Sequence, residues 1–244
     1  IGFDWGDEAA ISDITRISQT LNLWEGEILS RFTWKGNEFN VRTVCHPAQD
    51  MISAHIDSHL HTGIKFHFPY PTGIHTDNAC DWDANDKHST EVLKQDTQSA
   101  VLKRTLDSTV YYVELKWEGK ALLKEKEKNY FVLLPQEDAF SFSCAFTANE
   151  PDQLAVLPDF FEVESLAKNH WVNFWEEGAA VDFSHCTDPR AKELERRVVL
   201  SQYLLAIQCA GSTPPQETGL TYNSWFGKYQ LEMNWRHQSW QQLW

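Results

Sequence analysis

The chain has 244 residues, of which 42% are hydrophobic and 23% are charged, and its formal net charge is −14. A field of that sign repels phosphate backbones and anionic bilayers, which argues against nucleic-acid binding and membrane-surface binding. No apolar run approaches the roughly 20 residues that a membrane span needs, so no membrane partner is expected. The length allows one large domain or two small ones with a substantial core.

The first part of the sequence has the pattern of an antiparallel β-sandwich, which we predict as a domain over residues 1–150. The alternating run 28–34 is followed by the turn signal Lys35-Gly36-Asn37 and then by 38–45, a hairpin pattern. Further strands are expected at 51–59, 63–69, 110–117, 130–134 and 140–146. The polar and acidic stretch 76–96 predicts a long loop over the edge of the sheet.

The pattern changes to helical spacing near Pro151, which predicts a linker helix within residues 151–185. The positions that recur at helical spacing are Val163, Leu166, His170 and Phe174, together with Trp171 and Trp175. A second helix is predicted after Asp188-Pro189, an N-cap followed by Pro, and is closed by Gly211. Its apolar stripe is Leu194, Val198, Ser201, Leu205 and Cys209.

The stretch Gly219–Trp244 combines planar rings, amides and a carboxylate at the start of a third predicted helix. A sugar-binding cleft needs such residues, because rings cover the apolar C–H faces of a sugar and polar groups fix its hydroxyls. The candidate substrate-binding residues are Tyr222, Asn223, Trp225, Lys228, Glu232 and Trp235.

The third predicted helix carries no stop signal before the sequence ends at Trp244. We therefore expect the chain to be an excerpt of a longer polypeptide. In that case residues 186–244 are the start of an incomplete helical domain, whose remainder is an expected partner of this chain.

Two segments carry a resemblance to the six-hairpin glycosidase superfamily, which includes maltose- and kojibiose-type phosphorylases and related bacterial glycosidases. They are the early strands Leu21–Trp34 and the segment from Gly219-Leu-Thr-Tyr to Gly227-Lys-Tyr-Gln-Leu-Glu232. The resemblance implies a β-supersandwich followed by the first helices of an (α/α)6 toroid. It also implies that Glu232 stands where the phosphorylase-like relatives have a sugar-binding Asp, and that Lys228 replaces a His. Leu231 departs from their Trp, and their general acid lies on a later helix, so no catalytic residue is assigned here.

Two plainer interpretations of the candidate residues remain open. If the third helix starts near Gly227, Lys228, Glu232 and Trp235 share one face. Lys228 and Glu232 would then also suit an ordinary exposed ion pair, and Trp235 a core position. Trp225 would equally suit a hydrophobic staple that fixes the entry of the chain into the helix.

Two other clusters contain residue types that are found in metal sites. His55, His59 and His61 fall with Asp57 on one face of a predicted strand, but no further ligand follows at a suitable spacing. The loop 81–86 resembles the opening of a calcium loop, but Asp86 stands where Gly is needed and Val92 where Glu is needed. The five cysteines form no CxxC pair and suggest small buried residues. No metal and no cofactor are expected.

The sequence therefore favours a carbohydrate-active enzyme that hydrolyses glycosidic bonds of oligosaccharides, and the resemblance implies inversion. The alternatives are a non-catalytic carbohydrate-binding module or a glycoside phosphorylase. The substrate class slightly favours a periplasmic or secreted location.

Overall fold

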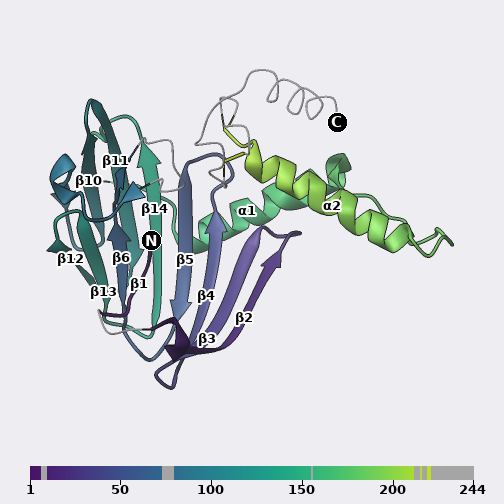
Figure 1. Cartoon of the computed structure of the whole chain (residues 1–244), viewed down its shortest axis with the longest axis horizontal. Coiled ribbons are helices and arrows are strands. Elements are labelled where there is room, and N and C mark those ends of the chain that lie inside the picture. The colour runs from purple at the N-terminus through teal and green to yellow at the C-terminus, as the bar shows by residue number, and fades with distance from the viewer. Residues whose placement is uncertain (7–9, 73–79, 155, 212–214, 216–218, 221–244) are drawn as a thin grey trace. The chain divides into compact units, whose positions relative to one another are not determined.

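The computed structural model describes the chain except residues 7–9, 73–79, 155, 212–214, 216–218 and 221–244. It divides into two compact units, one of residues 1–70 with 81–171 and the other of residues 71–80 with 172–244. The first unit is an antiparallel β-sandwich with a helix on it, and the second contains a further helix (Figure 1). An antiparallel sandwich followed by helices, as predicted, is thus confirmed, while the toroid stays a prediction.

The larger layer of the sandwich is an eight-stranded antiparallel sheet. Neighbouring strands are joined mostly by short turns, as alternating runs between turn residues predict. In spatial order the strands are β2 (Ile14–Asn22), β3 (Glu27–Trp34), β4 (Asn37–Cys45), β5 (Met51–Asp57), β14 (Ala139–Thr147), β11 (Thr109–Glu118), β10 (Ser99–Leu106) and β9 (His88–Gln95).

The smaller layer is a four-stranded sheet. Its order is β1 (Gly2–Asp4), β6 (Gly63–His67), β13 (Tyr130–Pro135) and β12 (Ala121–Glu127). The remaining short elements are the paired strands β7 (Tyr70–Pro71) and β8 (Cys80–Asp81) and the 3-10 turns η1 (Ile11–Asp13) and η2 (Asn85–Lys87).

The main core lies between the two sheets and is built from alternate residues of their strands. From the small sheet, Phe66, Phe131 and Leu133 point inward and are almost completely buried. Rings from the other side include Phe39, which stacks on Phe32 with centroids 5.1 Å apart. Each such side chain contributes about 1.5–3 kcal/mol by leaving water, so this core accounts for much of the sandwich's stability.

A second core forms where α1 (Phe160–Phe174) packs on the outer face of the eight-stranded sheet. Phe160, Val163 and Ala167 are buried against Val44 and Met51. Asp159 and Glu162 start the helix with a reciprocal pair of hydrogen bonds, each carboxylate accepting from the other residue's backbone N–H at 2.9 Å. Among the helical positions named from the sequence before the turn at Trp175, only Val163 is buried, because the sheet lies against the neighbouring stripe 160–163–167.

Polar contacts extend the docking of α1 along the β3–β4 side of the sheet. Arg42 forms ion pairs with Glu27, at 2.7 Å, and with Glu164 of the helix. Lys168 pairs with Glu25 of the β2–β3 turn at 2.5 Å. The helix is thus held by one buried apolar stripe and by ion pairs on its flank.

In the second unit, a π turn (Trp175–Ala179) contains Gly178 at φ 124°, and α2 (Ala191–Gln208) follows. Apolar residues occur on every side of α2, yet Ala191 is the only described residue of this helix that is buried. Leu194, Leu200 and Leu204 are 52%, 37% and 43% exposed. The first half of α2 is charged, with Lys192, Glu193, Glu195, Arg196 and Arg197, and only the part from Val198 to Ile207 is apolar on every side. A helical segment that is apolar on every side is typical of the interior of a larger assembly of helices.

The main difference from the sequence prediction is that the pattern did not indicate the longer strands β2, β9, β10 and β12 or the short strands β1, β7 and β8. The predicted loop 76–96 is wrong for His88–Gln95, which forms the edge strand β9. Lys94, near its end, donates hydrogen bonds to the carbonyls of Pro151 and Asp152 at 2.6 and 2.8 Å. Pairing with β10 supplies the stability that the polar sequence of β9 does not indicate.

Candidate functional site

The six candidate substrate-binding residues, Tyr222, Asn223, Trp225, Lys228, Glu232 and Trp235, lie outside the described residues. The structure describes how the chain approaches them. The backbone N–H of Leu220 donates to the carbonyl of Gln208, the last residue of α2, at 3.0 Å. Gly219 has φ 89°, and a Cβ there would lie 2.3 Å from Oε1 of Gln208. The candidate segment therefore begins at the carboxyl end of α2, at a turn that requires glycine.

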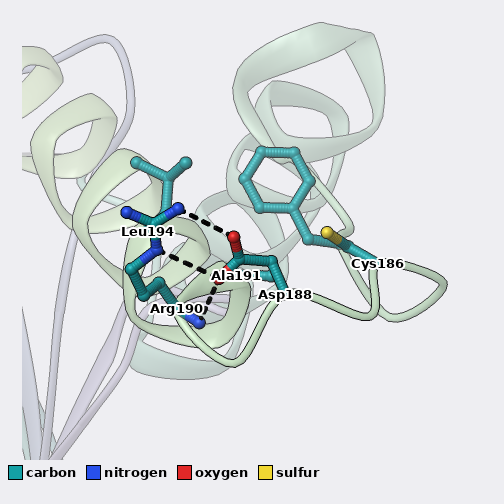
Figure 2. Close-up of a pocket in the computed structure, with 6 residues that line it drawn as sticks. Cys186, Asp188, Arg190, Ala191 and Leu194 are labelled. Atoms are coloured by element: carbon teal, nitrogen blue, oxygen red, sulfur yellow. Dashed lines mark hydrogen bonds and ion pairs between the residues drawn. The ribbon is translucent and has the colours of Figure 1, made fainter.

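A pocket of about 510 Å³ lies at the opposite end of α2. Its lining residues come from the loop before the helix and from the first turns of the helix, and they are Phe183, Cys186, Asp188, Arg190, Ala191 and Leu194. Figure 2 shows the Asp188 carboxylate beside the Arg190 guanidinium, with Leu194 and Cys186 around them. The loop is fixed to the helix by the backbone N–H of Phe183, which donates to Glu195 at 2.7 Å.

Two carboxylates at this end of α2, Asp188 and Glu193, are paired with arginines. Asp188 accepts a hydrogen bond of 2.8 Å from Nη2 of Arg190. Hydrogen bonds from the side chain and then from the backbone of Arg190 lower the pKa of the Asp188 carboxyl. Arg196 and Arg197 lower the pKa of Glu193 to about 2. Both carboxylates therefore stay ionised near neutral pH. They are suited to accept hydrogen bonds from hydroxyls and unsuited to act as a general acid.

The histidines considered as a metal site are divided between two places. His55 contacts Ser141 through Nδ1 at 2.7 Å and packs against the ring of Phe160. His59 and His61 follow the end of β5 and lie 2.7 and 2.9 Å from the carboxylate of Asp138. They tie this turn to the β13–β14 connection, so the expectation that all three share one strand face is wrong, because β5 ends at Asp57.

The acidic loop 81–86 is organised by contacts within the protein. Asp81 accepts a hydrogen bond from the backbone N–H of Asp83 at 3.0 Å, and Asp86 pairs with Lys128 at 3.1 Å. Across the described part of the chain, no cluster of three or more His, Cys, Asp or Glu side chains is arranged to hold a metal ion. Of the five cysteines, only Cys144 is fully buried, and its burial raises the pKa of the thiol to about 12.

An aromatic group that the sequence analysis did not identify lies on the outer face of the four-stranded sheet. His67 stacks on Tyr130 with centroids 4.6 Å apart, and Trp82 packs on the other side of the group, 4.7 Å from His67. Trp82 is 50% exposed. The alternation within 63–67 and 130–134 indicated which residues face outward, but only the strand register brings His67 beside Tyr130.

None of the helices in the described residues combines the length and the apolar character needed to cross a membrane. No family model matches the sequence, and no curated protein matches it.

Solved structures that are similar to the chain include the following two. One is named as a kojibiose phosphorylase from the human microbiome, with 12% identity and a TM-score of 0.40 over 80% of this chain. The other is a glycoside hydrolase family 81 protein from Clostridium thermocellum, with 9% identity and a TM-score of 0.31 over 65% of this chain. The matched regions span 25% and 18% of those two proteins, so this chain corresponds to a minor part of each.

Proposed function

We propose that this chain is part of a carbohydrate-active enzyme that hydrolyses glycosidic bonds of oligosaccharides with inversion. The observation that carries the proposal is the order of the elements. An antiparallel sandwich is followed by a helix docked on it, and then by a helix whose second half is apolar on every side and which leads into the aromatic segment 219–244. The six-hairpin glycosidases, which the sequence resembles, have this order.

The incompletely covered surface of α2 supports a longer helical domain. Leu194 and Leu204 are about half exposed, and a packed helical layer would cover them. In this proposal residues 186–244 begin the toroid, and its remaining helices bury α2 and supply the general acid. The carboxylate of Glu232 accepts hydrogen bonds from sugar hydroxyls, and Trp225 and Trp235 stack on the sugar rings.

The test is to express the complete gene product and to assay it against a panel of disaccharides and short oligosaccharides, with and without inorganic phosphate. Hydrolysis without phosphate is expected, and NMR of the first product should show an inverted anomeric configuration. Cleavage that requires phosphate would identify a phosphorylase instead. A protein that binds saccharides but never cleaves them would identify a non-catalytic module.

The role of Glu232 is tested in the same protein. E232A should raise the KM for the substrate or lower kcat/KM by at least about tenfold, which corresponds to about 1.4 kcal/mol. The matched control is E176A, which removes an exposed carboxylate from the turn after α1. Equal kinetic constants for E232A and E176A would show that Glu232 does not bind the substrate. The hydrolase proposal would be unaffected, because the activity assay tests it separately.

A further inference from the structure

The outer face of the eight-stranded sheet carries a row of polar side chains next to the start of α1. His55, Ser141 and Glu118 are register partners on the adjacent strands β5, β14 and β11. Nδ1 of His55 lies 2.7 Å from Oγ of Ser141, and Nε2 of the same ring lies 3.3 Å from Oδ1 of Asp57. The hydroxyl of Ser141 also reaches the carboxyl of Glu118. The four side chains thus form one chain of hydrogen bonds across three strands.

This chain lacks one hydrogen when His55 is neutral and Glu118 is ionised. Nε2 of His55 carries the hydrogen that faces Asp57, so Nδ1 is an acceptor. The single hydrogen of the Ser141 hydroxyl then faces two acceptors, Nδ1 of His55 and the carboxylate of Glu118, and can serve only one of them. One added proton supplies the missing donor, so folding favours the uptake of a proton by this chain.

Glu118 is the better place for the added proton. Its Oε1 is buried and has no hydrogen-bond partner among the described residues. An unpaired oxygen costs more in a carboxylate than in a neutral acid, because the buried charge has lost its water. Burial is the largest influence on the Glu118 carboxyl and raises its pKa. The hydrogen bond from Ser141 opposes this, the negative charge of Asp159 adds to it, and the pKa stays above the usual value.

The charged groups around Glu118 come from its own strand, from β5, from the β13–β14 connection and from the start of α1, and they are Lys116, His55, Asp57, Glu137, Asp159 and Glu162. The intervening strand β14 carries no charged residue. The ammonium group of Lys116 donates to the carbonyl of Leu157, just before α1, at 2.6 Å. The two positive groups that act on Glu118, Lys116 and His55, lower its pKa without cancelling the effect of burial.

The first turn of α1 depends on Asp159, the carboxylate that acts on Glu118 from the helix side. Its Oδ1 accepts a hydrogen bond of 2.9 Å from the backbone N–H of Glu162 and so caps the helix. The next residue, Phe160, is completely buried, and its ring centroid lies 5.4 Å from that of His55. An ionised Glu118 repels the capping carboxylate, whereas a neutral Glu118 does not.

We propose that Glu118, Ser141 and His55 form a proton-dependent latch for the start of α1. While the chain of hydrogen bonds holds its added proton, the sheet presents no carboxylate to Asp159 and the first turn of α1 stays docked. When Glu118 loses the proton, that turn loosens, and Val163 and Ala167 keep the rest of the helix on the sheet. The latch belongs to the sandwich and does not depend on the reaction proposed above.

The latch works on the acid side of the titration of Glu118. The folded pKa of Glu118 is raised above its unfolded value of about 4.3, so the folded protein binds a proton that the unfolded chain does not between those two values. The stabilisation is complete below about pH 4.3 and is lost as the pH rises through the folded pKa.

The test is hydrogen exchange of the Glu162 and Val163 amides, which bond to Asp159, between pH 4.5 and 8 with correction for intrinsic rates. Their protection should fall by about three- to fivefold as the pH rises, the effect of one charge at a helix terminus. E118Q is neutral at every pH and should keep the protection high throughout. The matched control is E114Q, on the same face of the same strand, where burial alone raises the pKa. E114Q should leave the pH dependence in α1 unchanged.

The titration of Glu118 itself is followed by NMR of its side-chain carboxyl carbon. D159N keeps a capping side chain but removes the charge, so it should lower the midpoint of Glu118 and flatten the pH dependence of exchange in α1. S141A should raise the midpoint, because the carboxylate loses its hydroxyl donor. The proposal would be overturned by exchange in the first turn of α1 that does not vary with pH or that varies equally in E118Q. A midpoint unchanged in both D159N and S141A would also overturn it.

Discussion

Arg104 donates a hydrogen bond of 2.9 Å to Nδ1 of His88 in the interior of the sandwich, where the two residues are 1% and 6% exposed. The same guanidinium nitrogen lies 2.7 Å from Oγ1 of Thr90 and 3.2 Å from Oδ1 of Asn129. The ring of Phe68 lies 4.8 Å from the guanidinium carbon. Arg104 is thus a buried cation held by neutral acceptors and aromatic rings.

The first prediction is that His88 makes the protein less stable as the pH falls. Arginine is always a donor, so Nδ1 of His88 must accept, and protonating it would place two donors face to face. Burial, and then Arg104, Lys128 and His67, lower the pKa of His88. The folded state therefore favours the neutral ring. Its contribution to stability is complete above the unfolded pKa of about 6.5 and is lost as the pH falls below it.

Urea unfolding between pH 5 and 8 measures this effect. The free energy of unfolding should fall towards pH 5 with a slope from His88 of at most about 1.4 kcal/mol per pH unit. H88Q should reduce the slope, because its amide has no such proton to bind. H185Q removes a histidine from an exposed loop and serves as the control. A slope that is unchanged in H88Q would contradict the prediction.

The second prediction concerns Arg104 itself. R104M keeps much of the side-chain volume but removes the donors that serve His88, Thr90 and Asn129. Each buried acceptor left without its partner costs about 1–3 kcal/mol, so the variant should lose roughly 2–5 kcal/mol of unfolding free energy. Chemical denaturation monitored by tryptophan fluorescence gives the value. A loss below about 0.5 kcal/mol would mean that the cluster does not stabilise the fold.

The sandwich could be predicted from sequence where a strand is buried on one face only. The run Arg31–Trp34 alternates polar and apolar residues and is followed by the turn signal Lys35-Gly36-Asn37, and β3 was located to within a residue. By contrast, β10 is buried on both faces from Ser99 to Leu102, so it does not alternate. β9 is mostly polar, and it forms a strand because it pairs with β10.

The candidate sites differ in the same way. The sequence points to the segment 219–235 as a candidate because its rings, amides and carboxylate are close together in the chain. The aromatic group of Trp82, His67 and Tyr130 could not be found in this way, because its residues lie on separate segments and the register between β6 and β13 brings two of them together. The burial of Arg104 could not be predicted either, since an arginine in a strand normally faces solvent.

The third prediction is that Arg42 fixes α1 on the sheet. Arg42 pairs with Glu27, whose side chain is 9% exposed, and with Glu164 of the helix, and it lies over the ring of Phe160. R42A leaves Glu27 without its cation and should cost about 1–2 kcal/mol, because Arg42 itself is partly exposed. Hydrogen exchange should accelerate in α1 more than in the strands. R31A, on the neighbouring strand, is the control, and equal exchange in both variants would exclude a docking role.

The last prediction uses two glycines that share a backbone conformation but differ in surroundings. Gly26 and Gly36 have φ of 68° and 81° in the turns on either side of β3. A Cβ on Gly26 would lie 2.0 Å from Cδ1 of Trp171 in α1, whereas nothing lies within 4 Å of a Cβ on Gly36. G36A should cost only the left-handed backbone strain of about 1–2 kcal/mol. G26A carries the same strain and must also displace Trp171, so it should lose at least about 1 kcal/mol more and make α1 exchange faster. Equal losses of unfolding free energy in the two variants would mean that Trp171 can be displaced at no energetic cost. In that case only the stripe of Phe160, Val163 and Ala167 would attach the helix to the sheet.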